Sequence, residues 1–97
     1  MPKHSENEQF RREWAALSQA EQDRFIVAMK KMVADLKAGR SYRSGLRIKR
    51  VQSRQDVWEM SWASNGRATF TTAPDPETGD THITWRRIGG HEILSNP

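Results

Sequence analysis

The chain has 97 residues and no cysteine, with a formal net charge of +4 and a hydrophobic fraction of 35%. This length predicts one compact domain over residues 1–97, and the lack of thiols excludes a disulfide framework and a thiolate metal site. No apolar stretch is long enough to span a membrane, and no secretion signal is visible, so we expect a cytoplasmic protein without a membrane partner.

The first third of the chain predicts an α-helical hairpin. Residues 5–17 indicate a helix capped by Ser5, and Ser18 and Glu21 have the capping-box spacing that starts a second helix, which ends at Gly39. The apolar positions at helical spacing are Phe10, Trp14, Leu17, Phe25, Ala28, Met29, Met32, Val33 and Leu36. This stripe of aromatic and methionine side chains is expected to form core rather than a ligand site, because no polar group converges on it.

The rest of the chain predicts strands. Apolar and polar residues alternate over residues 46–51, 57–63, 67–72 and 82–88. Asn65-Gly66 is a strong hairpin signal between the second and third strands. We therefore expect an α+β fold in which the N-terminal α-helical hairpin packs on one face of a twisted four-stranded antiparallel sheet, and the other face stays free.

Positive charge is concentrated over residues 37–55, which contain no acid at all. The cations there are Lys37, Arg40, Arg43, Arg47, Lys49, Arg50 and Arg54. Such a run makes a polyanion the leading partner, either nucleic acid or an acidic protein segment. A merely solvated basic face is the alternative.

A histidine, His91, directly follows the last predicted strand and its two glycines. Gly89-Gly90 allows the backbone to turn without a Cβ, so we expect His91 to emerge beside Arg86 or Arg87. Because neighbouring residues of a strand point to opposite faces, the two arginines are not expected to share one face. The candidate occupants of the free sheet face are Arg47, Lys49, Glu59, Ser61, Arg67, one or both of Arg86 and Arg87, and His91.

Three short motifs in this order resemble the RelE/ParE superfamily of bacterial toxins from toxin-antitoxin pairs, and in particular its YafQ-like branch. They are Trp58-Glu59-Met60-Ser61-Trp62, Asn65-Gly66-Arg67 and Arg87-Ile88-Gly89-Gly90-His91-Glu92-Ile93-Leu94. The resemblance extends from Phe10 onward and implies the RelE-like fold. It also implies a cognate antitoxin as protein partner.

The resemblance further implies a ribosome-dependent endoribonuclease that inhibits translation by cutting messenger RNA in the A site of the 30S subunit, without metal or cofactor. Arg67 matches the arginine that holds the scissile phosphate, and His91 matches the histidine that acts in proton transfer. Glu59 stands where RelE has a basic residue, and is either a general base or a sign of altered chemistry. Arg87 is expected to join Arg67 on the phosphate, because arginine forms a bidentate fork matched to phosphate oxygens. The residues expected to hold the RNA backbone are Arg47, Lys49, Arg50 and Arg86.

Two other functions stay open at this point. The chain is alternatively a non-catalytic ParE-like toxin that binds a protein target such as DNA gyrase, or an RNA- or ribosome-binding module that has lost catalysis. The glutamate at position 59 favours the second of these. The chain also lacks the additional histidines found in YafQ-like toxins, unless His82 substitutes for one of them.

Overall fold

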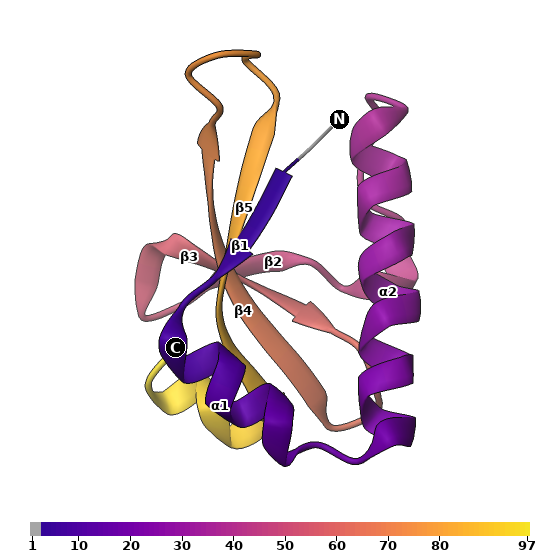
Figure 1. The fold of residues 1–97 in the computed structure, drawn as a ribbon, viewed down its shortest axis with the longest axis vertical. Helices are drawn as coiled ribbons and strands as arrows, with labels where there is room; N and C mark the ends of the chain where they lie inside the picture. The colour runs from indigo at the N-terminus through magenta and orange to yellow at the C-terminus, as the bar shows by residue number, and fades with distance from the viewer. Residues whose placement is uncertain (1–2) are drawn as a thin grey trace.

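The computed structural model describes residues 3–97, which form a mixed β-sheet with two helices and two short 3₁₀ helices (Figure 1). The elements are β1 (Lys3–Glu6), α1 (Glu8–Ala16), α2 (Gln19–Lys37), η1 (Ser44–Leu46), β2 (Lys49–Val51), β3 (Arg54–Ser61), β4 (Gly66–Pro74), β5 (Thr81–Gly90) and η2 (His91–Ser95). The strand order is β1-β5-β4-β3-β2. No helix in residues 3–97 is both long and apolar enough to cross a membrane.

The sheet has five strands instead of the four antiparallel ones predicted, because the N-terminal segment pairs with β5 in parallel. Ser5, expected to cap a helix, lies in β1 opposite Thr84. The helix begins later, where the Asn7 side chain accepts a hydrogen bond from the backbone N–H of Phe10 at 2.9 Å. A strand of four residues is too short to show a periodic pattern in sequence, so the sequence predicts the helix to begin too early.

The second helix begins and ends as the sequence predicts. Ser18 and Glu21 form a reciprocal capping box, with distances of 3.2 Å from the Glu21 N–H to Ser18 Oγ and 2.9 Å from the Ser18 N–H to Glu21 Oε1. Beyond the other end of the helix, Gly39 has a φ of +67°, a left-handed conformation that favours glycine.

The main core lies between the helices and the sheet and is built around Trp85. The rings of Phe10, Phe25 and Phe70 lie with centroids 6.0, 5.0 and 5.1 Å from it. Met32 and Met60 are fully buried in the same cluster. The prediction that the aromatic and methionine stripe forms core is therefore confirmed.

The opposite face of the sheet is not wholly free, because η2 folds back onto it. Ile93 of η2 is buried, and a Cβ added to Gly89 would come 3.0 Å from its Cγ2 atom. Gly90 has φ −90° and ψ −173°, so β5 runs on through the glycine pair instead of turning there. A Cβ on Gly90 would meet the ends of the Asn65 and Glu92 side chains, which would have to shift to admit it.

The first predicted strand after the helices is shorter than expected, because the chain turns within it. Residues 44–46 form η1, and Arg47 adopts a left-handed conformation with φ 50°. Only Lys49–Val51 pairs with β3. Leu46 still lies in the main core and Ile48 packs against it, as the alternation predicts.

Candidate functional site

The strand register places the candidate side chains in two rows across the sheet. Glu59 lies opposite Lys49 on one side and Thr69 on the other, and in the next row Arg67 lies opposite Ser61. Directly opposed residues of antiparallel strands share one face of the sheet. Met60 and Ala68, which alternate with them, lie in the main core, so both rows face away from the helices.

Glu59 is the centre of this face. It is 7% exposed, and no hydrogen bond or ion pair to its carboxylate occurs within residues 3–97. It borders two hollows, which we name by a characteristic residue. The arginine hollow, of about 390 Å³, is lined besides Glu59 by Ser44, Arg47, Ile48, Lys49, Ser61 and Arg67. The histidine hollow, of about 600 Å³, is lined besides Glu59 by Lys49, Arg50, Val51, Gln52, Ser53, His91 and Leu94.

Arg67 is fixed in the arginine hollow by the turn between β3 and β4. Its Nη1 donates to the backbone carbonyls of Ala63, Ser64 and Gly66 at 3.3, 3.4 and 2.8 Å. None of its hydrogen bonds in the described part of the chain uses Nε or Nη2. That edge of the guanidinium therefore remains available for the two oxygens of a phosphate.

His91 lies on the other side of Glu59, in the histidine hollow. It is the first residue of η2 and is exposed, and its backbone N–H donates to Asn65 Oδ1 at 3.4 Å. Since Glu59 borders both hollows, the carboxylate lies between the hollow that holds Arg67 and the hollow that holds the imidazole. The structure thus places Arg67 and His91 in separate hollows that both border Glu59.

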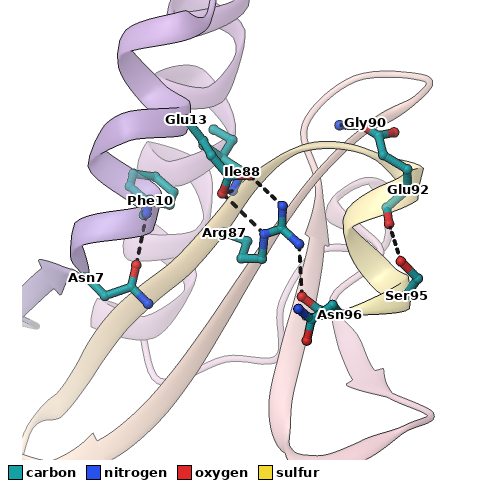
Figure 2. A network of polar contacts seen from close by, with 9 residues as sticks. All are labelled: Asn7, Phe10, Glu13, Arg87, Ile88, Gly90, Glu92, Ser95 and Asn96. Atoms are coloured by element: carbon teal, nitrogen blue, oxygen red, sulfur yellow. Dashed lines mark hydrogen bonds and ion pairs between the residues drawn. The ribbon is translucent and has the colours of Figure 1, made fainter.

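Arg87, the fourth, is bound elsewhere (Figure 2). Its Nη2 lies 2.7 Å from Glu13 Oε2, and its Nη1 donates to the Asn96 carbonyl at 3.0 Å. The hydrogen bonds that Arg87 donates to the Glu13 carboxylate raise the pKa of Arg87 above its ordinary value. Arg87 lines neither the arginine nor the histidine hollow, and it ties α1 and the C-terminal segment to β5.

Arg86 does not point away from Arg87, contrary to the alternation argument. Phe70 pairs with Trp85 while Thr69 pairs with Arg87, so Arg86 is the extra residue of a β-bulge. A bulge breaks the two-residue period of the strand. Arg86 Nε donates to the Pro97 carbonyl at 3.2 Å, so both arginines contact the C-terminal segment.

The other predicted RNA-binding residues surround Glu59. Arg47 lines the arginine hollow, Arg50 the histidine hollow, and Lys49 both. All three are exposed. The Arg50 guanidinium carbon lies 5.1 Å from the centroid of the Trp58 ring, which is a cation–π contact.

His82 does not supply the missing histidine of the site. It lies near the start of β5, where its Nε2 is 3.1 Å from Ser5 Oγ, whereas His91 follows the other end of that strand. The structure instead adds Asn65, which fixes the backbone of His91, and Thr69, whose buried Oγ1 has no partner within residues 3–97. The alternation of residues 67–72 puts Thr69 on the same face as Arg67, whereas no sequence signal joins Asn65 to His91.

No protein-family model matches the sequence, and comparison with curated proteins gives no match either. Solved structures do match. A chain of the RelB-RelE antitoxin-toxin complex from Methanococcus jannaschii is 14% identical, with a TM-score of 0.62 over 94% of both chains. A histidine-to-glutamine mutant of YafQ from E. coli is 10% identical, with a TM-score of 0.67 over 97% of this chain and 98% of that one. A YoeB/ParE toxin from Agrobacterium tumefaciens is 8% identical, with a TM-score of 0.64 over 92% of this chain and 98% of that one. The resemblance to the RelE/ParE superfamily is thus confirmed at the level of the fold.

Proposed function

We propose that this chain, which has the fold of the RelE and YafQ toxins, is the toxin of a toxin-antitoxin pair and cuts messenger RNA on the ribosome. The fold supports the toxin class. The observation that carries the nuclease is the position of Glu59: a nearly buried carboxylate without a partner in the described chain, between the hollows of Arg67 and His91. A protein that only binds RNA has no need of an acid without an ion-pair partner on a cationic face, because the acid repels the phosphates.

The chemistry needs three groups around one phosphodiester. Glu59 takes the proton from a 2′-hydroxyl, whose oxygen then attacks phosphorus. The open Nε and Nη2 edge of Arg67 binds the phosphate oxygens and stabilises the added negative charge. His91 gives a proton to the 5′-oxygen as the P–O5′ bond breaks, which leaves a 2′,3′-cyclic phosphate and a 5′-hydroxyl.

Arg87 has no part in this step, because Glu13 and the Asn96 carbonyl hold its guanidinium. Arg47, Lys49 and Arg50 hold the RNA backbone on either side of Glu59. Arg86, bound to the C-terminal segment, lines neither hollow and is left out of the RNA contacts.

The proposed protein partner is a cognate antitoxin that covers this cationic face. The matching RelE structure from M. jannaschii is a complex with RelB, and a matching YafQ structure from E. coli is a complex with DinJ. A segment rich in acidic residues would neutralise the same cations that hold RNA. The proposed site of action is the messenger RNA in the ribosomal A site, in the cytoplasm.

The test is induced expression in a bacterial host, with messenger RNA ends mapped by primer extension on translated and untranslated transcripts. The variants are His91→Ala, Glu59→Gln and Arg67→Ala, and Arg54→Ala is the control, because Arg54 is exposed and pairs only with Asp56 among the residues described. Cuts in translated transcripts are expected from the wild type and the control. Loss of a proton-transfer group is expected to lower cleavage by about 10²- to 10⁴-fold.

Three other outcomes would change the function or the mechanism proposed. Toxicity without cuts would indicate a protein target such as DNA gyrase. Soluble protein with neither toxicity nor cuts would indicate a binding module without catalysis. Undiminished cuts in Glu59→Gln would remove the carboxylate from the reaction and leave a substrate-assisted route.

A further inference from the structure

A further hollow of the described chain lies beside the proposed reaction centre. This α2 hollow, of about 600 Å³, lies between α2 and the turn that joins β3 to β4. Apolar side chains that line it include Val27, Leu46 and Trp62, and Val27 is 54% exposed, which is unusual for a large apolar residue here. Arg24 and Lys31 line it from the same helix.

These residues form one stripe of α2. Arg24, Val27, Ala28 and Lys31 follow one another at intervals of three, one and three residues, so they lie on one helical face over two turns, about 10 Å. The stripe therefore presents an apolar middle with a cation at each end. That pattern matches a nucleotide chain, whose bases offer flat apolar faces between charged phosphates.

The cations of the stripe are not used by the protein itself. Arg24 and Lys31 are exposed, and neither side chain has an ion pair within residues 3–97. Asp23, the acid that lines the same hollow, accepts a hydrogen bond from Gln19 at 2.9 Å. Arg43, also on the rim, is bound to Asp35. The α2 hollow thus has two cations to offer to a polyanion.

Arg47 joins this hollow to the proposed reaction centre. It lines both the α2 hollow and the arginine hollow, as do Ser61 and Arg67. Its φ of 50° makes it the only residue other than glycine with a positive φ in the described part of the chain. A left-handed arginine is strained, and such strain in a protein is concentrated at functional positions. An arginine is therefore kept where the local backbone favours glycine.

We propose that the α2 hollow is a subsite for the nucleotides that flank the scissile phosphate on one side, with Arg47 on the phosphate between the two hollows. A base rests on Val27 and Trp62, and Arg24 and Lys31 bind the phosphates next to it. The proposal rests on the proposed function, since it extends the RNA strand bound at Arg67. An RNA strand fits better than an acidic protein segment, because the hollow is continuous with the arginine hollow through three shared residues.

The test compares the binding of two non-cleavable 2′-O-methyl RNA oligonucleotides, a trimer and a hexamer of mixed sequence, by fluorescence anisotropy. The variant is Arg24→Gln/Lys31→Gln. The matched control is Lys30→Gln/Lys37→Gln, which removes the same charge at the same spacing from another face of α2 that lines none of the three hollows. The wild type is expected to bind the hexamer roughly tenfold more tightly than the trimer.

In the variant, the tighter binding of the hexamer relative to the trimer (the gain from length) is expected to disappear, while the affinity for the trimer stays the same. The slope of log K against log salt for the hexamer is expected to fall by about 1.4, the value for two phosphates of a single strand. The control double variant is expected to keep the gain. Arg47→Gly is expected to melt no lower than the wild type, since it removes backbone strain, and to weaken the binding of both oligonucleotides.

Four results would overturn the subsite. The first two are a gain in affinity from length that survives in Arg24→Gln/Lys31→Gln, and an equal loss of that gain in the control. The other two are no binding of either oligonucleotide by the wild type, and a variant that no longer binds a poly-glutamate peptide but still binds the hexamer as the wild type does. The last would assign the hollow to a protein partner. Failure of the proposed function is distinct, because it would appear as missing cleavage on the ribosome while the length-dependent binding persists.

Discussion

Glu13 of α1 binds two groups of β5 with one carboxylate. Its Oε2 lies 2.7 Å from Arg87 Nη2, and its Oε1 accepts the backbone N–H of Ile88 at 3.3 Å (Figure 2). Strand β1 pairs with β5 as far as Trp85, whose carbonyl also accepts the N–H of Asn7. Beyond the end of β1, Glu13 therefore binds the next part of β5, and this contact fixes α1 against the sheet.

A double-mutant cycle with Glu13→Gln and Arg87→Gln is expected to give a coupling energy of about 1 to 2 kcal/mol in urea unfolding, because both side chains are largely shielded from water. The same cycle on Arg12 and Glu8, a 3.5 Å pair of exposed side chains on α1, is the control and is expected to give almost no coupling. Equal coupling in the two cycles would show that Arg87 and Glu13 contribute no more than a surface pair.

Asp35 near the end of α2 should make stability depend on pH. Its buried carboxylate accepts two side-chain hydrogen bonds and one backbone hydrogen bond from Arg43, and a further one from Arg40 at 2.8 Å. The hydrogen bonds from the Arg43 side chain and backbone, helped by Arg40, hold the pKa of Asp35 well below its ordinary value. The carboxylate is therefore ionised in the folded protein at pH values where it binds a proton in the unfolded chain.

Because the folded pKa is depressed, the stabilisation is complete above the unfolded pKa of about 4 and is lost as pH falls below it. Asp35→Asn is expected to melt lower than the wild type at pH 7, and the gap in melting midpoint should stay constant down to about pH 5 and then shrink. The control is Asp56→Asn. The hydrogen bond from Arg54 also lowers the pKa of Asp56, but both side chains are exposed, so its gap should be much smaller. A gap that widens toward low pH would contradict the assigned role of Asp35.

Three glycines are expected to differ in their tolerance of a methyl group. A Cβ on Gly66 would come 2.6 Å from the Trp62 ring, whereas nothing lies within 4 Å of one on Gly45. Gly66→Ala should cost about 1 to 3 kcal/mol by overpacking, and Gly45→Ala should stay within about 0.5 kcal/mol. Gly89→Ala, whose Cβ would lie 3.0 Å from Cγ2 of the buried Ile93, should fall between them in urea unfolding. A tolerant Gly66 would mean that the Trp62 ring can move aside.

Asn65→Ala tests whether the β3–β4 turn positions the histidine. The Asn65 side chain accepts the backbone N–H of His91 and lies close to Gly90. Its loss should leave the melting temperature nearly unchanged, since both residues are exposed, and should lower cleavage by about 10- to 100-fold through a displaced imidazole. Ser64→Ala, in the same turn, is the control. Full cleavage by Asn65→Ala in the primer-extension assay would show that η2 fixes His91 without this contact.

Local patterns in the sequence determined the second helix, the alternating faces of β3 and β4, and the side of the sheet that carries Glu59 and Arg67. These features depend on residues only a few positions apart, as in the capping box of Ser18 and Glu21. The periods of helix and strand decide which side chains share a face before any long-range contact forms. The sequence therefore predicted most of the candidate site.

Contacts between distant parts of the chain decided the rest. Glu13 binds Arg87 from 74 residues away, the N-terminal segment becomes a strand only beside β5, and η2 covers part of a face that alternation left open. None of these has a local period, because each depends on which backbone groups and charges remain unpaired once the sheet has formed. The sequence by itself determined that Glu59, Ser61 and Arg67 share one face of the sheet, and only the tertiary structure decided which of the charges near them are available there.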